Sequence, residues 1–390
     1  MERVVDAIDA REASDLLKAL VREPSVNPPG DTTAVVRVLG ERLGEAGLEW
    51  RSLEAREGLA NLVARLPGSR PGKTLVLNGH IDVVPAGDGW TVDPFAAEER
   101  EGRVIGRGTS DMKGGVVAMA LAMLALKRVG APFAGELVFT AVADEETGGQ
   151  FGTRFLLEQG IGRGAALAIV GEPTSLRVEL GNRGIAWFEV TVKGKAGHSG
   201  RPQTGANAVH YAGRLIAAIA DMEFDLRDDL FEVPTPSITV TMVRGGLKAN
   251  IVPPDCTLTI DRRLLPGETA ALAARQIEDL IASMPQEGVS ASVECLKSSE
   301  PYLIGTGEPV VQALVRAHER VVGPGLPFRA KGGGTDGSHL YHLGGVSTAL
   351  YGPGDPNLAH TADEFVVLDN VVSAAKVYAL AALDLLGAES

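Results

Sequence analysis

The pattern of apolar positions predicts an α/β layer in the first half of the chain. Apolar residues recur at helical spacing over Ala13–Val21 and Ala34–Leu48, with a proline- and glycine-containing break between them. Short apolar runs at Asn61–Leu66 and Thr74–Leu77 are bounded by glycine or proline, which is typical of strands buried on both faces. Met112–Val129 predicts a core helix, and strands and helices continue to alternate beyond it. This order favours a largely parallel sheet flanked by helices.

The pattern changes after about residue 184. An alternating strand at Ile185–Gly194 is followed by a helix, two strands, a helix and a strand, at Gly205–Ala220, Ser237–Val243, Cys256–Arg262, Thr269–Ser283 and Val289–Leu296. This β-α-β-β-α-β order is the ferredoxin-like signature. Helices at Glu308–Val322 and Leu368–Leu386 then resume the first pattern. We therefore predict a larger domain formed by residues 1–182 and 298–390, with a small α+β domain, residues 183–297, inserted into it.

Composition narrows the class of protein. Lys and Arg number 37 against 50 Asp and Glu, and the resulting net charge of −13 disfavours nucleic-acid and membrane-surface partners. The N-terminus lacks the apolar stretch of a signal peptide, and no apolar run has the length of a membrane span. The two cysteines, Cys256 and Cys295, are expected to be small core residues of a cytoplasmic protein. Glycine, at 48 of 390 residues, exceeds its usual share of ~7% and predicts many tight turns.

Residues suited to metal binding follow several predicted strands. His80 and Asp82 lie two apart in LNGHIDVVP, and side chains at i and i+2 share one face of a strand, so the carboxylate can orient the imidazole toward a metal. Taken separately, each segment also has an ordinary explanation. A His-x-Asp pair is often a hydrogen-bonded turn, Asp111 in GRGTSDMKGG suits a helix N-cap, and the acidic segment ADEETGG suits a solvated loop.

Convergence of these segments favours a metal site. Open α/β sheets place ligand sites at the carboxyl ends of their strands, and the candidates that follow predicted strands are His80, Asp111, Glu145, Glu146, Glu172 and His360. Acidic residues crowded at a buried strand end require a compensating cation. Two imidazoles with several carboxylates suit a divalent metal such as zinc, and their number exceeds one tetrahedral site. These residues predict two metals, with one glutamate left over as a base.

The ordered set LNGHIDVVP, GRGTSDMKGG, ADEETGG, GEPTS and AHTADE resembles the di-zinc metallopeptidase/deacylase family. That family contains acetylornithine deacetylase, succinyl-diaminopimelate desuccinylase, aminoacylases and glutamate carboxypeptidases. The resemblance spans nearly the whole chain, and the longest gap, between Glu172 and His360, accommodates the inserted domain. It implies a zinc-peptidase-like catalytic domain with an inserted lid and dimerisation domain. It also implies two zinc ions per subunit, with cobalt or manganese as alternatives, that activate water for amide hydrolysis.

The resemblance implies a role for each candidate ligand. Asp111 would bridge the two metals. His80 and Glu172 would complete one site, and Glu146 and His360 would complete the other.

Two further acidic residues would act beside the metals. Asp82 would orient His80 as a hydrogen-bonding partner of its imidazole. Glu145 would be the general base, taking a proton from water and delivering it to the leaving amine.

The inserted domain and one glycine-rich turn carry candidate substrate contacts. In VKGKAGHSGRP, His198 matches the family's oxyanion-stabilising histidine, which often reaches the active site of a partner subunit; a solvated turn histidine is the alternative. LKANIVPPD and IDRRLLPGE match family motifs that imply carboxylate recognition by Asn250 and Arg263, with Arg262 or a surface salt bridge as alternatives. Thr335 in KGGGTDGSHLYH is a candidate contact for the acyl or side-chain end of the substrate.

The resemblance favours one reaction and leaves others open. We expect a cytoplasmic homodimer, paired through the inserted domain, that hydrolyses the amide bond of an N-acyl amino acid or short peptide. A dipeptidase or glutamate-type carboxypeptidase would use the same metal centre, and a non-catalytic binding protein on this fold is a remoter alternative. Ser338 and His339 stand where family members commonly have an Arg-Phe pair, which leaves the substrate open. His210 and His318 are expected to be packing or surface residues.

Overall fold

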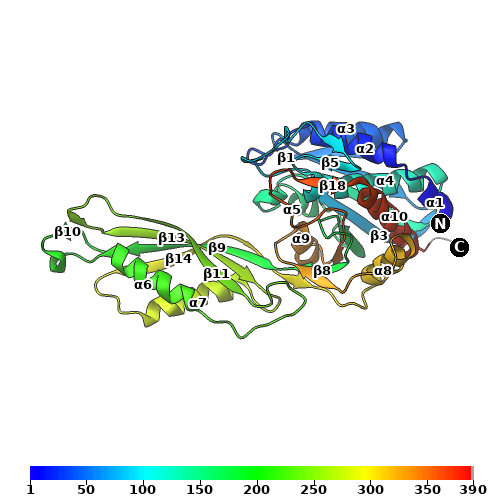
Figure 1. Ribbon diagram of the computed structural model, residues 1–390. Helices are drawn as coiled ribbons and strands as arrows, with labels where there is room; N and C mark the ends of the chain where they lie inside the picture. Colours follow the sequence, from blue (N-terminus) through cyan, green and yellow to red (C-terminus); the bar gives the residue numbers. More distant parts are fainter. Residues whose placement is uncertain (388–390) are drawn as a thin grey trace. The chain divides into compact units, whose positions relative to one another are not determined.

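The computed structural model describes residues 1–387, which form two compact units (Figure 1). The first unit contains Met1–Gly181, Ile304–Lys331 and the described chain from Thr335 onward. The second contains Asn182–Leu303 together with Gly332–Gly334. The chain therefore leaves the first unit and returns to it, and the predicted α/β fold with an inserted α+β unit is confirmed.

The first unit is built on one large sheet. Its strands are β1 (Glu49–Arg56), β2 (Leu59–Pro67), β3 (Arg70–His80), β6 (Ala134–Val142), β7 (Leu167–Val170), β8 (Glu179–Asn182), β16 (Arg329–Lys331) and β17 (Ser347–Leu350). The order across the sheet is β1-β2-β6-β3-β7-β17-β8, and β16 also pairs with β8. The central strands β6, β3, β7 and β17 run parallel, while β1, β2 and β8 pair antiparallel at the flanks. The parallel centre brings the carboxyl ends of β3, β6 and β7 to the same edge.

Helices cover both faces of this sheet (Figure 1). α4 (Gly114–Val129) contacts β3 and β6 on one face and packs against α10 (Leu368–Leu385). α5 (Thr153–Glu158) and α9 (Asp336–His342) pack together on the other face, over a core that includes Val76, Val138 and Leu340. The remaining elements of the unit are α1 (Glu2–Asp6), α2 (Ala10–Val21), α3 (Thr33–Glu45), α8 (Pro309–Val321) and a small sheet of β4 (Glu98–Arg100), β5 (Arg103–Ile105) and β18 (Phe365–Val367).

The core helix α4 is buried around most of its circumference, as its apolar sequence predicts. It begins at Gly114 rather than at the predicted Met112, because the preceding turn, η1 (Thr109–Lys113), has non-helical backbone angles at Asp111 and Met112. Its first turn lies against the end of β7, where a Cβ atom on Gly115 would stand 2.1 Å from the carbonyl oxygen of Gly171. Only glycine permits this close approach, which places the start of α4 beside the residue that precedes Glu172.

The second unit has the predicted ferredoxin-like order. Its long strands are β9 (Gly184–Lys193), β11 (Ser237–Gly245), β13 (Asp255–Leu264) and β14 (Ser290–Ser299), in the antiparallel sheet order β11-β13-β9-β14. Two helices, α6 (Ala208–Ala220) and α7 (Ala270–Ser283), pack against this sheet around a shared apolar core. Short strands β10 (Gly197–His198) and β12 (Ile251–Val252) form a separate ribbon.

Two details of the second unit differ from the sequence expectations. α6 starts at Ala208, three residues later than predicted, because the side chain of Asn207 caps it by accepting from the His210 amide, 3.0 Å away. Cys256 is buried in the core, whereas Cys295 is exposed, so only one of the two cysteines is a core residue.

The approach of α4 to β7 predicts opposite effects for two helical glycines. Gly115→Ala should destabilise the protein by about 1–3 kcal/mol, because the added methyl group overlaps a main-chain oxygen. Gly213→Ala is the matched control: this glycine lies on the exposed side of α6 with no atom within 4 Å of the added Cβ, so alanine should stabilise by about 0.5–1 kcal/mol through helix propensity. Thermal unfolding measures both, and an unchanged midpoint for Gly115→Ala would contradict the packing argument.

Candidate active site

The first unit gathers most of the predicted site residues at one edge of its parallel sheet. His80 is the last residue of β3, and Glu172 follows β7. Glu145 and Glu146 follow β6 in a single 3₁₀ turn, η2 (Glu145–Thr147), as expected for strands whose carboxyl ends meet. Asp111 comes from η1, and His360 comes from the loop between β17 and β18.

The His80 imidazole is buried and held between two oxygen atoms. Its Nδ1 lies 2.9 Å from the main-chain oxygen of Asp82, and its Nε2 lies 3.1 Å from Oδ1 of Asp111. Nδ1–H therefore donates to the carbonyl oxygen of Asp82. This hydrogen bond directs Nε2 toward Asp111, where it could bind a metal. Burial lowers the pKa of His80, but the hydrogen bond to Asp111 and the charge of Glu145 outweigh burial and hold that pKa well above its ordinary value.

Asp111, Glu146 and His360 complete the cluster. Nε2 of His360 lies 3.3 Å from Oε2 of Glu146 and 3.6 Å from Oδ2 of Asp111. One donor atom each from His80, Asp111 and Glu146 lies within 4.8 Å of the others. Oε1 of Glu146 is buried and has no hydrogen-bond partner within residues 1–387.

His80, Asp111 and Glu146 form a group that fits a divalent metal, and His360 lies against two of its members, Asp111 and Glu146. Ligand atoms about 2.0–2.1 Å from a tetrahedral zinc stand roughly 3.3 Å from one another, close to the 3.1, 3.3 and 3.6 Å separations observed here. The unpartnered oxygen of Glu146 offers a further donor atom to a cation. Two neutral imidazoles and two carboxylates are also a donor set that zinc accepts.

Asp82 supports the site differently from the sequence expectation. Its carboxylate oxygen Oδ1 is 3.6 Å from Nδ1 of His80, which instead donates to the main-chain oxygen of Asp82. The carboxylate, fully buried, accepts the amide protons of Glu145 and Glu146, each at 3.2 Å, and a side-chain hydrogen bond from Asn27 at 2.9 Å. Asp82 thus fixes the turn that carries both glutamates.

Glu145 has the environment of a general base. It is partly buried beside the ligand cluster. Burial and the charge of Glu172 raise the pKa of its carboxyl well above the ordinary value, against the opposing charge of His80. A raised pKa means that this carboxyl accepts a proton more readily than an ordinary glutamate does, which suits an acid–base role.

Glu172 is engaged by a residue that sequence reasoning did not select. Its Oε2 lies 2.9 Å from Nζ of Lys331, the last residue of β16, and both side chains are largely buried. Burial lowers the pKa of Lys331, but the charges of Glu172 and Asp111 outweigh it and raise that pKa above the ordinary value. Glu172 and His360 both lie outside the three-residue ligand group found among residues 1–387, but His360 contacts two members of that group. The structure therefore brings together four of the five predicted ligands and pairs the fifth with a lysine.

A second missed residue, Glu364, fixes the turn that carries Asp111. Its fully buried carboxylate accepts the amide protons of Gly108, Ser110 and Asp111 at 2.8–3.0 Å and pairs with Arg107 at 2.7 Å. Glu364 was present in the segment AHTADE, four residues after His360, as the only sequence signal for this role.

The candidate substrate contacts fall in both units. In the second unit, His198 is exposed on β10, and the adjacent Ser199 amide donates to the main-chain oxygen of Asn250 at 3.1 Å, so these two candidates share one ribbon. Nδ1 of His198 accepts from the Gly200 amide at 3.0 Å, which leaves Nε2–H as a donor. Arg263 forms a two-point ion pair with Asp261, at 2.7 and 3.1 Å.

The other candidates have structural partners. Arg262 is buried and pairs with Glu268 at 2.6 Å. In the first unit, the Thr335 hydroxyl accepts from the Gly337 amide and so caps α9. Nε2 of His339 lies 3.1 Å from the main-chain oxygen of Gly148.

The two remaining helical histidines follow the expectation. His318 is buried against the Tyr351 hydroxyl at 2.9 Å. His210 is exposed on α6.

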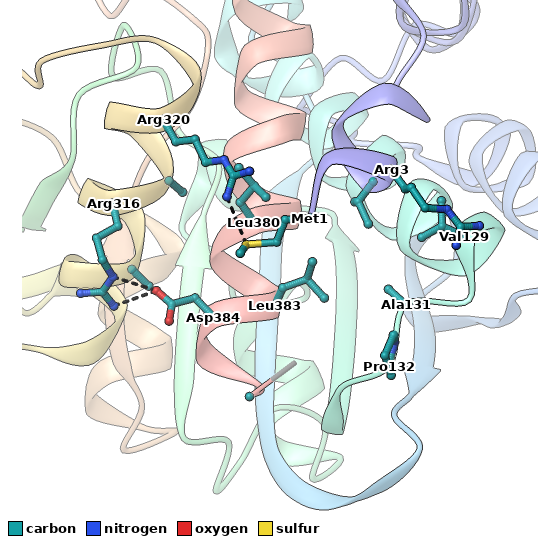
Figure 2. Close-up of a pocket in the computed structure, with 14 residues that line it drawn as sticks. Met1, Arg3, Val129, Ala131, Pro132, Arg316, Arg320, Leu380, Leu383 and Asp384 are labelled. Atoms are coloured by element: carbon teal, nitrogen blue, oxygen red, sulfur yellow. Dashed lines mark hydrogen bonds and ion pairs between the residues drawn. The ribbon is translucent and has the colours of Figure 1, made fainter. Parts of the chain in front are cut away.

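A separate cavity of about 590 Å³ lies elsewhere in the first unit, among α1, α8 and α10 (Figure 2). Leu380 and Leu383 line it, an Arg316–Asp384 ion pair closes one side, and Arg320 donates to the sulfur of Met1. It contains none of the candidate ligands or the base. The candidate metal ligands therefore lie outside this cavity.

The fold and the donor set define a metal-dependent hydrolase that acts on amide bonds. The chain belongs to the peptidase family M20/M25/M40, whose family model matches residues 76–384. None of the helices within residues 1–387 combines the length and apolarity needed to cross a membrane.

Named relatives agree with this family. A succinyl-diaminopimelate desuccinylase of Wolinella succinogenes is 34% identical over 93% of this chain and 97% of its own length. An acetylornithine deacetylase of Myxococcus xanthus is 32% identical over 82% of this chain and 83% of its own length.

Solved structures share the fold. An aminopeptidase from Bacillus cereus aligns with a TM-score of 0.79 over 97% of this chain and 99% of its own, at 22% identity. A dinuclear metal-binding peptidase of the M20 family from Bacillus subtilis aligns with a TM-score of 0.73 over 98% of this chain and 100% of its own, at 16% identity. The family thus includes a dinuclear metal-binding peptidase, and this chain has a candidate group of three metal ligands.

The buried carboxyl of Asp336 should make the stability of the protein depend on pH. This residue at the start of α9 is 1% exposed, and burial raises the pKa of its carboxyl to about 7, against the opposing charge of His80. Between about pH 4 and 7 the folded chain therefore holds a proton that the unfolded chain releases, so this group's contribution to stability falls as the pH rises.

Asp336→Asn should remove that dependence. In metal-free buffer, the variant should be more stable than the wild type at pH 8, by up to about 4 kcal/mol, and the difference should shrink toward pH 4. Denaturant unfolding of both proteins at each pH measures it. Parallel pH profiles for the two proteins would show that Asp336 ionises in the folded chain as it does in the unfolded chain.

Proposed function

We propose that this chain is a zinc-dependent deacylase that cleaves the amide bond of an N-acyl amino acid. The observation that carries the proposal is the cluster of two imidazoles and two carboxylates, 3.1–3.6 Å apart, beside the raised-pKa carboxyl of Glu145. Relatives named succinyl-diaminopimelate desuccinylase and acetylornithine deacetylase, at 34% and 32% identity, support the substrate class.

The proposed ligands are His80, Asp111, Glu146, Glu172 and His360, with Asp111 shared between two zinc ions. Zinc bound there would polarise the scissile carbonyl and lower the pKa of a nearby water. His80 presents Nε2 as its ligand atom because its Nδ1–H is held by the main chain of Asp82.

The chain's own residues then handle the proton. Glu145 takes a proton from the attacking water and returns it to the leaving amine, a role that its raised pKa supports. Asp82 holds the amides of Glu145 and Glu146 and so keeps base and ligand at a fixed separation.

The proposed substrate contacts are His198, Asn250, Arg263 and Thr335. His198 supports a role as an oxyanion donor because its Nε2 carries the proton. Arg263 would have to exchange its partner Asp261 for a substrate carboxylate, and Thr335 would act from the start of α9.

A purified-enzyme assay tests the reaction and its base together. The metal-stripped protein, resupplied with zinc or cobalt, should release amines from N-acetyl or N-succinyl amino acids faster than from N-formyl amino acids or dipeptides. Glu145→Gln should lower kcat by at least about a hundredfold, because the base is lost, while the metal content stays unchanged. The exposed Glu158→Gln on α5 is the matched control and should keep full activity.

Other outcomes of this assay assign other functions. Preferential cleavage of dipeptides would establish the peptidase alternative on the same centre. Bound metal without turnover of any substrate would point to the non-catalytic binding protein. Full activity in Glu145→Gln would show that the base is misassigned.

We further propose a cytoplasmic homodimer paired through the second unit. Its edge strand β11 is exposed along much of its length, with Met242 and Val243 at 45% and 58% exposure. An exposed apolar edge strand is suited to pairing with a second copy.

A charged substitution on the edge strand β11 tests the proposed dimer. Sedimentation should show a dimer of the 40.7 kDa chain, and Val243→Lys should shift it toward monomer. The exposed Val233→Lys, in the loop before β11, is the control and should leave the dimer intact. A wild-type monomer at micromolar concentration would contradict the proposal.

A further inference from the structure

We propose that Lys331 acts as a built-in cation at the Glu172 side of the metal centre, so that this chain binds one divalent ion tightly and a second one weakly. The tight position is the one formed by Asp111, Glu146 and His360, and the weak position is the one formed by Asp111, His80 and Glu172. This inference rests on the proposed metal centre and concerns how strongly each of its two positions is filled.

The ion pair between Lys331 and Glu172 is built into the fold. Nζ lies 2.9 Å from Oε2 of Glu172, and the two side chains are 16% and 4% exposed. Lys331 ends β16, which is held by pairing with β8, and Glu172 follows the central strand β7. The ammonium also reaches the main-chain oxygen of Pro173, at 3.4 Å. The strands β16 and β7 therefore hold Lys331 and Glu172 together.

The ammonium serves more than one buried carboxylate. Asp111 and Glu179 also interact electrostatically with Lys331. Glu179 is 8% exposed, and its Oε2 has no hydrogen-bond partner among the described residues. Lys331 is thus the largest of three positive charges, with Arg177 and Arg329, that compensate this carboxylate outside the ligand cluster. Moving Lys331 away to admit a metal would leave Glu179 buried and less well compensated.

A second divalent ion must compete with this arrangement. A metal bound to Glu172 would stand about 2 Å from its oxygen, and an ammonium hydrogen-bonded to the same carboxylate would then lie within a few ångströms of the metal. Two cations on one carboxylate repel each other strongly in a largely buried site. Among the described residues, Glu146 forms an ion pair with His360 and with no lysine or arginine. His360 becomes neutral when it binds a metal.

Metal titration of the intact chain tests the proposal. Stripped protein is equilibrated with chelator-buffered zinc over a range of free concentrations, and bound zinc is counted by elemental analysis. The wild type should take up one zinc per chain first and a second with about tenfold to hundredfold lower affinity. Lys331→Met, which keeps the length of the side chain without its charge, should strengthen the second step at least tenfold and leave the first unchanged.

Two further variants separate charge from structure. Lys331→Arg keeps a cation and should keep the wild-type spacing between the two steps, which also covers the case in which Lys331→Met fails to fold. Lys127→Met removes an exposed lysine from α4 and should change neither step.

The results distinguish this inference from the proposed function. Two zinc ions binding the wild type with equal affinity, or a second step unchanged in Lys331→Met, would overturn the role of Lys331 and leave the metal enzyme intact. A wild type that binds no zinc at any concentration would overturn the metal centre itself.

Discussion

Burial of negative charge at the carboxyl ends of β3, β6 and β7 is the constraint on which the rest of the site depends. Asp82, Asp111, Glu146 and Glu172 lie within one region of the first unit, and each is wholly or largely removed from water. Isolated carboxylates would be neutralised or expelled from such a place. The chain keeps them there by giving each a specific compensating group.

Those compensating groups are of three kinds. Main-chain amides donate hydrogen bonds to Asp82 and Glu364, which accept two and three of them respectively, and side chains such as Asn27 and Arg107 complete the set. Imidazoles face Asp111 and Glu146, and a lysine faces Glu172. The first kind is permanent because it is part of the backbone. The second kind can be exchanged for a metal, since a histidine that loses its proton becomes a ligand. This difference separates the supporting carboxylates from the reactive ones.

The sequence predicted the parts of this arrangement that depend on local order. Alternating apolar runs indicated the parallel sheet, and parallel strands necessarily bring their carboxyl ends to one edge, so His80 and Glu146 could be placed together without a structure. The partners that compensate them could not be found in this way. Asn27 reaches Asp82 across 55 residues and Glu364 reaches Gly108 across 256, and neither contact leaves a periodic signal in the chain.

The role of Lys331 could not be predicted from the sequence either. In the sequence it is one basic residue before a run of glycines, with no feature that distinguishes it from a surface lysine. Its role appears only when β16 pairs with β8 and places the end of β16 beside the residue that follows β7. The position of Asp82 was likewise predictable, but its hydrogen bonding was not, because a short main-chain bond to His80 frees its carboxylate for the η2 turn.

The division of the chain into two units gives these charges a further consequence. All candidate ligands, the base and their compensating groups belong to the first unit, while His198, Asn250 and Arg263 belong to the second. The network that fixes the metal ligands is therefore complete within one compact unit and needs no residue of the insertion. Substitution of the proposed contacts His198, Asn250 and Arg263 is therefore expected to leave the buried charges of the first unit undisturbed. The candidate metal ligands and the groups that compensate their charge thus lie in a different part of the chain from the proposed contacts His198, Asn250 and Arg263.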